Sequence, residues 1–302
     1  MKRRTPSTVQ FGRSMRLILP AAAILIVGIT AIMGFLVYKI AHPEAAPESV
    51  NPSHYLLPSL DVLISSAGHD EIPAWWIPGL KGAPGIILAP GYGMSRADVL
   101  SLAVPLHENE FNVLIYDQRG SGDDPRGSSA LGLCEADDLT EAVRFLQGRP
   151  DSNPQRIGIW GVDVGALAAL KIAEAFPQIH AIAADSVFLS PSDFLSYRIE
   201  EDFGLNNRLL QFGCYQIFRL SHVLRSLSEA DSISVQALSD RSILFIKGEN
   251  RKMLGRLTTG IYESIRPQKE LIEFKTARVR MMSGEDQRSY DRQVADFFHL
   301  NL

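Results

Sequence analysis

Short apolar runs that alternate with helical patterns fill most of the chain after residue 60. Apolar runs of about five residues, bounded by turn residues, are typical of strands buried on both faces. Strands that alternate with helices favour a parallel sheet with right-handed crossovers. The strands are expected at 61–65, 72–76, 85–89, 112–116, 156–160, 181–184, 242–246 and 270–274, and helices at 97–108, 134–147 and 287–298.

The first two of these strands lie so close together in the sequence that they predict an antiparallel hairpin. Residues 191–235 interrupt the alternation with Phe-, Leu- and Ile-rich helical segments, which predict a cap over one edge of the sheet. The fold class is therefore α/β, an open and mostly parallel sheet with helices on both faces and a helical cap. In such sheets the ligand site lies at the carboxyl ends of the strands.

The first part of the chain has a different pattern. Residues 17–38 form a mostly apolar run without a charge, long enough at about 1.5 Å per residue to cross a hydrocarbon core of about 30 Å. A cleaved signal peptide would have an apolar core of only about 7–15 residues, so an uncleaved anchor is favoured. The chain then divides into a basic segment (1–16), a transmembrane helix (17–38), a Pro-rich linker (39–58) that spaces the domain from the bilayer, and a folded domain (59–302) with its cap (191–235).

Charge indicates the orientation of this anchor. Five basic residues precede the apolar run and only Lys39 follows it closely, which predicts a cytoplasmic amino terminus and an extracytoplasmic domain at the cell membrane. Residues 1–39 hold six of the 30 basic residues and none of the 34 acidic ones, so the remainder carries 24 − 34 = −10. That charge disfavours nucleic acid and anionic lipid as partners.

The two cysteines leave one question open. Cys134 and Cys214 match no metal-ligand spacing, so neither a metal nor another cofactor is expected. An extracytoplasmic location permits a disulfide between them, but two free thiols are the interpretation favoured from the sequence.

Residues 156–170 predict a strand, a sharp turn and a helix in immediate succession, with small residues at Gly161, Gly165 and Ala166. Small residues allow the helix to approach the strand closely. The residue presented at the turn is Asp163.

Four segments together carry a resemblance to a known family. They are P-G-Y-G-M-S-R (90–96), Y-D-Q-R-G-S-G (116–122), L-G-L-C-E-A-D-D-L (131–139) and I-G-I-W-G-V-D-V-G (157–165). From about residue 61 to the end, the chain resembles the α/β-hydrolase superfamily, and within it the bacterial membrane-anchored hydrolases related to the BEM46-like and prolyl-oligopeptidase-like groups. This resemblance implies a nucleophile elbow at Asp163, an acid after the seventh strand, a late histidine and an oxyanion hole of two backbone N–H groups.

All three side chains of the implied catalytic triad are altered. Asp163 stands where the family has serine. The acid is replaced by Arg251, or by Asn250 under a one-residue shift, and the histidine by Arg278 or Val279. Without an imidazole there is no group to take and return a proton, a role worth about 10²- to 10⁴-fold in rate. The oxyanion hole needs only the N–H groups of Tyr92 and Val164.

Two interpretations of Asp163 remain open. It is either a nucleophile, with His222 of the cap domain as the base, or the N-cap residue of the following helix. In the second case its carboxylate occupies its own oxyanion hole. Asp185, at the end of a strand, is a displaced acid or a turn residue. The favoured prediction is a membrane-anchored binding protein or pseudoenzyme whose small-molecule ligand or protein partner the sequence does not name. The alternative is an active hydrolase of the ester, epoxide or haloalkane type.

Overall fold

A computed structural model describes residues 9–44, 50–65, 71–121, 127–223, 238, 240–265, 268–277 and 279–302. Within these residues the strands form a single sheet in the order β1-β2-β4-β3-β5-β6-β7-β8. Strands β1 and β2 form the expected antiparallel hairpin, β2 is antiparallel to β4, and the remaining pairs are parallel. The strands are β1 (Leu60–Ser65), β2 (Glu71–Ile77), β3 (Ala83–Ala89), β4 (Asn112–Tyr116), β5 (Ser152–Val162), β6 (Ile179–Asp185), β7 (Ser242–Gly248) and β8 (Lys269–Phe274). The predicted α/β class is thus confirmed.

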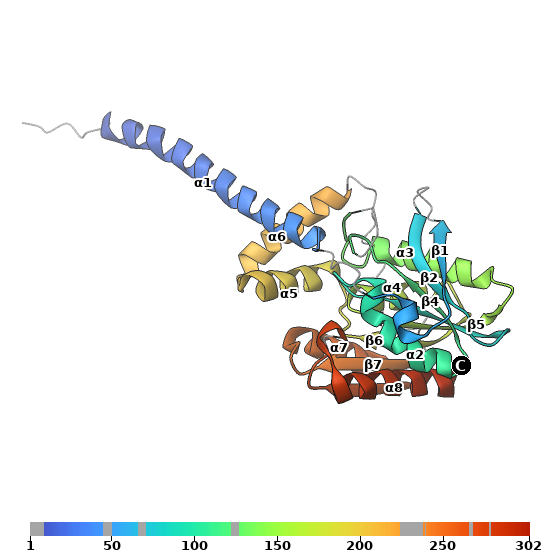
Figure 1. The fold of residues 1–302 in the computed structure, drawn as a ribbon. Helices are drawn as coiled ribbons and strands as arrows, with labels where there is room; N and C mark the ends of the chain where they lie inside the picture. The colour runs from blue at the N-terminus through green and yellow to red at the C-terminus, as the bar shows by residue number, and fades with distance from the viewer. Residues whose placement is uncertain are drawn as a thin grey trace, which may run out of the picture.

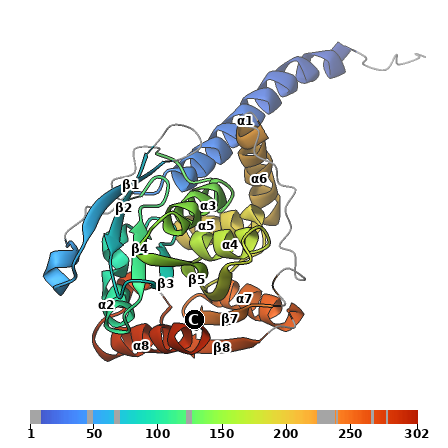
Figure 2. The ribbon, with the colours of Figure 1, turned by 90° about the vertical axis from the view of Figure 1, so that its right-hand side faces the viewer.

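Helices cover both faces of this sheet (Figures 1 and 2). One apolar cluster joins the sheet to α3 (Cys134–Gln147), α4 (Val164–Ile172) and α7 (Lys252–Ser264). A second cluster joins the opposite face to α2 (Leu100–Glu108) and α8 (Gly284–Asn301). The central strands β3, β4 and β6 are almost wholly buried, as a parallel sheet covered on both faces requires. Helix α7 has no counterpart among the elements expected from the sequence.

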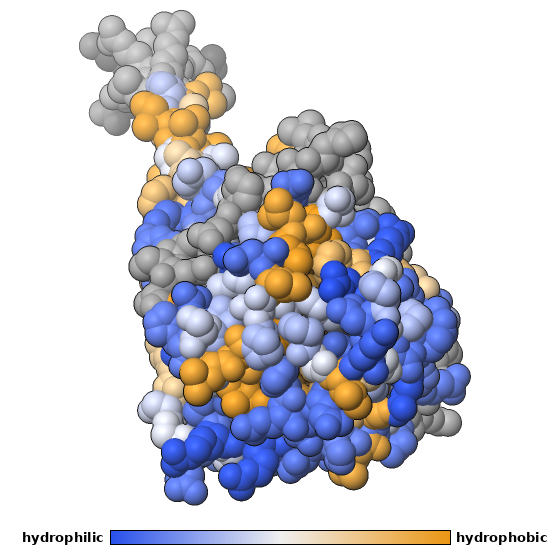
Figure 3. Space-filling view, turned by 45° about the vertical axis from the view of Figure 1, so that its right-hand side comes forward, coloured by the Kyte–Doolittle hydropathy of each residue, from blue (hydrophilic) through white to orange (hydrophobic). Residues whose placement is uncertain are grey.

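The cap consists of α5 (Pro191–Phe203) and α6 (Arg208–Val223) in its described part. A third apolar cluster packs both of them against α4 and against the last turns of the long helix α1 (Val9–Ala41). Residues Leu19–Ala41 of α1 are long and apolar enough to span a membrane. Figure 3 shows this helix as an apolar column that protrudes from a mostly hydrophilic domain.

The end of α1 is bonded to the domain. The hydroxyl group of Tyr92 donates to the carbonyl of Ile40 at 2.7 Å, and the N–H of Ser129 donates to the carbonyl of Ala41 at 2.8 Å. A Cβ atom at Gly120 would lie 3.4 Å from Cδ of Pro43. The structure therefore differs from the expected spacer where the linker begins, because the residues directly after α1 lie against the domain.

Candidate functional site

The turn between β5 and α4 is sterically tight. A Cβ atom added at Gly161 would lie 2.6 Å from the carbonyl carbon of Gly165, and one at Gly165 would lie 2.4 Å from the carbonyl oxygen of Ala89. Asp163 takes a φ of 40° and a ψ of −99°, a region that non-glycine residues rarely occupy. The close approach of backbone to backbone thus holds one strained, buried residue at the carboxyl edge of the sheet.

Two backbone groups bind the Asp163 carboxylate. Its Oδ1 accepts from the N–H of Val164 at 2.6 Å and from the N–H of Tyr92 at 2.8 Å. These are the two N–H groups that the family resemblance assigns to the oxyanion hole, and both donate to the same oxygen atom. Hydrogen bonds to a charged oxygen are each worth about 1.5–3 kcal/mol, so this geometry fixes the carboxylate against the amino end of α4.

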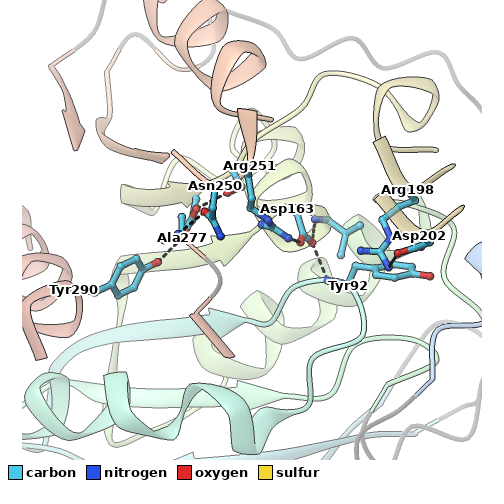
Figure 4. Close-up of polar contacts among 11 residues, drawn as sticks. Tyr92, Asp163, Arg198, Asp202, Asn250, Arg251, Ala277 and Tyr290 are labelled. Carbon is cyan, nitrogen blue, oxygen red and sulfur yellow. Dashed lines mark hydrogen bonds and ion pairs between the residues drawn. The ribbon is translucent and has the colours of Figure 1, made fainter. Parts of the chain in front are cut away.

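The other carboxylate oxygen faces a cation. Nη2 of Arg251 lies 3.3 Å from Oδ2 of Asp163 (Figure 4), and both side chains are more than nine-tenths buried. Arg251 lies three residues after the end of β7 and directly precedes α7, at the position where the family resemblance implies an acid. Burial disfavours its charge, but Asp163, Tyr197 and Asp185 together outweigh this effect and raise the pKa of Arg251. The guanidinium therefore stays charged and has no acceptor with which to take a proton.

The neighbouring altered positions hold the loop after β8. Oδ1 of Asn250 accepts from the N–H of Ala277 at 3.1 Å, so Asn250 joins this loop to the end of β7. Val279 is buried, and Arg278 lies outside the described residues. Of the two positions at which the resemblance implies a histidine, the described one therefore holds the apolar side chain of Val279.

A second buried carboxylate lies at the end of β6. Oδ1 of Asp185 accepts from the hydroxyl of Ser186 at 2.7 Å, and Oδ2 accepts from the hydroxyl of Tyr290 at 2.9 Å. Nε1 of Trp160 donates to that same tyrosine oxygen at 3.0 Å. Burial raises the pKa of Asp185 to about 7, against the lowering effect of Ser186, Arg251 and Tyr290. In the described residues Asp185 has no imidazole partner, so it completes no triad there.

A pocket of about 500 Å³ opens above Asp163. Its lining combines the elbow with the end of α1, the cap helix α5 and the loop after β8. Charged residues of this lining are paired, with Arg198 at 2.7 Å from Asp202 and Lys39 at 3.1 Å from Glu44. The guanidinium of Arg198 also lies over the ring of Tyr92 at 4.5 Å. The lining residues from α1 and its end are Lys39, His42, Pro43 and Glu44.

These four residues are a part of the site that the sequence pattern did not assign. A Pro-rich stretch after an apolar helix is typical of a spacer, and its composition gives no sign that it folds back onto the domain. The histidine of the pocket is consequently His42, whereas the sequence singles out His222. Residue 222 lies in α6, and its side chain lies outside the described residues.

The charged residues of the segment 116–122 and the two cysteines have no assigned role in the pocket. Asp117 accepts from the N–H of Arg96 at 2.9 Å, and Arg119 forms two bonds of 2.6 Å with Asp138, so both loop residues have structural partners. Both cysteines are free thiols. No group of three or more His, Cys, Asp or Glu side chains within the described residues is placed to hold a metal ion.

Comparisons with known proteins agree with this geometry at the level of the fold. A family model described as alpha/beta hydrolase fold matches residues 84–264. An uncharacterized protein of Mycobacterium tuberculosis, MT2364, is 30% identical over 53% of this chain and 58% of its own length. The uncharacterized protein YqkD of Bacillus subtilis is 27% identical over 70% of both chains. The chain spans about half the length of the curated relatives it matches first. The esterase Pf2001 of Pyrococcus furiosus superimposes with a TM-score of 0.63 at 20% identity, over 86% of this chain and 97% of its own.

Proposed function

This chain belongs to the α/β-hydrolase fold family, and we propose that it is a membrane-anchored member that binds a ligand above its elbow without standard serine-hydrolase activity. The observation that carries this proposal is the position of Oδ1 of Asp163. It receives the N–H groups of both Tyr92 and Val164, which in an active serine hydrolase would stabilise the oxyanion of the substrate. A carboxylate in that position excludes a second negative oxygen.

Proton transfer is the second missing element. Serine-hydrolase chemistry needs a base that takes the proton of the nucleophile and returns it to the leaving group. Arg251 stands in the position implied for the acid and holds Asp163 in an ion pair, while Val279 contributes only hydrocarbon. Neither side chain can relay a proton. The pocket has a volume of about 500 Å³ and a charged lining, which supports the binding of a ligand.

The membrane anchor is the third part of the proposal. Leu19–Ala41 has the length and composition of a span, and the excess of basic residues before it favours a cytoplasmic amino terminus. The pocket and the rest of the domain then lie outside the cytoplasm, at the cell membrane.

A hydrolase with Asp163 as its nucleophile is the second candidate. Because Oδ1 is held by two N–H groups, Oδ2 is the oxygen that would attack. His42 lines the same pocket as Asp163 and is the histidine that this candidate would use to activate water. Arg251 opposes this chemistry, because its charge pairs with Oδ2 and lowers the nucleophilicity of that oxygen.

Turnover by the full-length protein in detergent micelles tests the two candidates. The substrates are short acyl esters, epoxides and haloalkanes, and the variants are Asp163→Ala and, as a preparation control, Asp296→Ala on the exposed face of α8. We expect the parent to be no more active than Asp163→Ala on every class. Turnover in the parent that Asp163→Ala abolishes and Asp296→Ala retains would refute the binding role, and a loss in His42→Ala would then identify the base.

Binding is measured separately. Small molecules are screened for those that raise the Tm of the full-length protein, with Arg280→Ala as the variant that changes the exposed rim of the pocket. The proposal predicts that some compounds raise the Tm of the parent protein and raise the Tm of Arg280→Ala by less.

A further inference from the structure

Helix α6 presents apolar side chains to the surroundings. Leu209, Phe212 and Leu220 are 82%, 63% and 66% exposed, and we call these three residues the α6 apolar face. Leu209 and Leu220 are eleven residues apart, close to three full turns, and Phe212 lies one turn from Leu209, so all three share one side of the helix. Large side chains gathered on one exposed face indicate an interaction surface.

Basic residues border this face on one side. Arg208 and Arg219 are exposed, and their eleven-residue spacing also places them in one row. Phe212 is four residues from Arg208 and seven from Arg219, so this row runs beside the α6 apolar face. A helix with an apolar stripe next to arginines has the pattern of helices that lie in the plane of a membrane interface.

The other border of the face is helix α1. A Cβ atom added at Gly213 would lie 2.6 Å from Cε of Met33, and Sγ of Cys214 lies 4.0 Å from the carbonyl oxygen of Met33. Figures 1 and 2 both show α6 beside the second half of α1. The depth of Met33 in the bilayer therefore sets the depth of the middle of α6.

The depth of Met33 follows from the length of the apolar run that precedes it in α1. Arg16 precedes the apolar run, so the hydrocarbon core can begin no earlier than about Leu17. From Leu17 to Met33 the helix rises only about 24 Å, whereas the hydrocarbon core is about 30 Å thick. The core must then extend about 6 Å beyond Met33, and more if α1 is tilted. Gly213 and Cys214, packed at Met33, lie inside this boundary.

We propose that α6 is embedded in the leaflet next to the domain, with its apolar face among the acyl chains and Arg208 and Arg219 at the headgroups. This inference rests on the anchoring of α1 in a membrane, which is part of the proposed function, and not on the absence of catalysis. The occupant of the apolar face is the bilayer that α1 crosses. Lys39, His42 and Glu44 then bring the pocket to the level of the lipid headgroups, because they lie at the end of the span or directly after it.

Nitroxide labels on the full-length protein in lipid nanodiscs measure this depth. Cys134 and Cys214 are first replaced by Ala, and single cysteines are introduced as Phe212→Cys on α6, Ile26→Cys in the middle of α1 and Arg292→Cys on the exposed side of α8. Collision of each label with molecular oxygen, which enters lipid, is compared with collision with a water-soluble nickel complex. Because Phe212 is exposed, the label changes little of the packing.

We expect the label at 212 to favour oxygen over the nickel complex by several-fold relative to the label at 292. The label at 26 lies about 10 Å deeper along α1 and should favour oxygen more strongly still. A label at 212 that collides with the nickel complex as often as the label at 292, while the label at 26 remains in lipid, overturns the embedding of α6 alone. A label at 26 in contact with water overturns the anchor as well. A label at 212 shielded from both reagents means that a second protein copy covers the face, and this also overturns the proposal.

Discussion

The backbone of the elbow and the side chains around it meet at residue 163 but obey different constraints. The backbone there is closely packed, with Gly161, Gly165 and the carbonyl of Ala89 so near one another that no side chain fits between them. The side chains beside it do not match the serine, acid and histidine that the family resemblance implies. An aspartate and an arginine form a buried ion pair there instead.

This difference shows that steric and chemical demands on the same turn are separable. The fold needs a strand, a turn and a helix at van der Waals distance, which backbone and small residues alone provide. Catalysis needs particular side chains at that turn. Here the presented residue has a role of its own, because the Asp163 carboxylate satisfies two backbone N–H groups and neutralises Arg251.

The sharpest test of the side-chain region is Arg251→Met. Methionine preserves much of the volume but leaves the Asp163 carboxylate buried without its cation, and breaking a buried ion pair from one side costs about 3–5 kcal/mol of unfolding free energy. We expect a loss of about 3 kcal/mol, the lower end of this range, because the N–H groups of Tyr92 and Val164 still bind the carboxylate. Thermal or chemical unfolding in detergent measures the loss.

Arg256→Met is the matched control, because Arg256 lies in the first half of α7, the helix that Arg251 precedes, and is exposed. Its expected effect is within about 0.5 kcal/mol. Adding Asp163→Ser to Arg251→Met removes both charges and should recover part of the loss. Equal effects of Arg251→Met and Arg256→Met would mean that the ion pair contributes nothing to the fold.

Asp185 provides a test by pH. Its pKa is about 7 in the folded protein against an ordinary 3.8, because burial disfavours the charged form. The folded state therefore binds more protons than the unfolded state between about pH 4 and 7, and the free energy of unfolding falls as pH rises through that range. Three pKa units at about 1.4 kcal/mol each set an upper limit of about 4 kcal/mol.

Asp185→Asn removes this titration while it keeps the shape of the protonated acid. We expect the Tm of the variant, relative to the parent, to rise between pH 5 and pH 8 in detergent. The comparison between the two proteins cancels the titration of Asp291, whose pKa burial raises to about 6. A Tm difference that stays constant with pH would show that Asp185 is charged throughout, held by Arg251 and Tyr290.

The sequence was sufficient for the scaffold because apolar runs and small residues have direct steric consequences. The strand 112–116 and the helix 134–147 have the predicted bounds, and the elbow lies where Gly161 and Gly165 allow it. Helix α7 was missed although its apolar residues have helical spacing, because Gly255, Gly260 and two threonines are poor helix formers and its N-cap, Arg251, makes no side-chain capping bond.

The site was less predictable. The partners of Asp163 depend on contacts between residues 71 and 88 positions apart in the chain, which no local pattern encodes. The pocket residues Lys39, His42 and Glu44 depend on the docking of the chain after α1, and the Pro-rich composition suggested a spacer there.

The backbone region is tested by Gly165→Ala, for which we expect a loss of about 1–3 kcal/mol in unfolding free energy, as in other overpacked sites. The added methyl group would lie 2.4 Å from the carbonyl oxygen of Ala89 and 2.9 Å from that of Pro90, and backbone at the centre of a sheet cannot move aside as a flexible side chain can.

The control is Gly260→Ala in α7, where a Cβ atom meets nothing within 4 Å and the better helix propensity of alanine should stabilise the protein by up to about 1 kcal/mol. Opposite signs in the two variants, measured by unfolding in detergent, would separate steric exclusion at the elbow from the general effect of replacing a helical glycine. If both variants gained stability, the elbow would tolerate a side chain, and the small residues there would have no steric role.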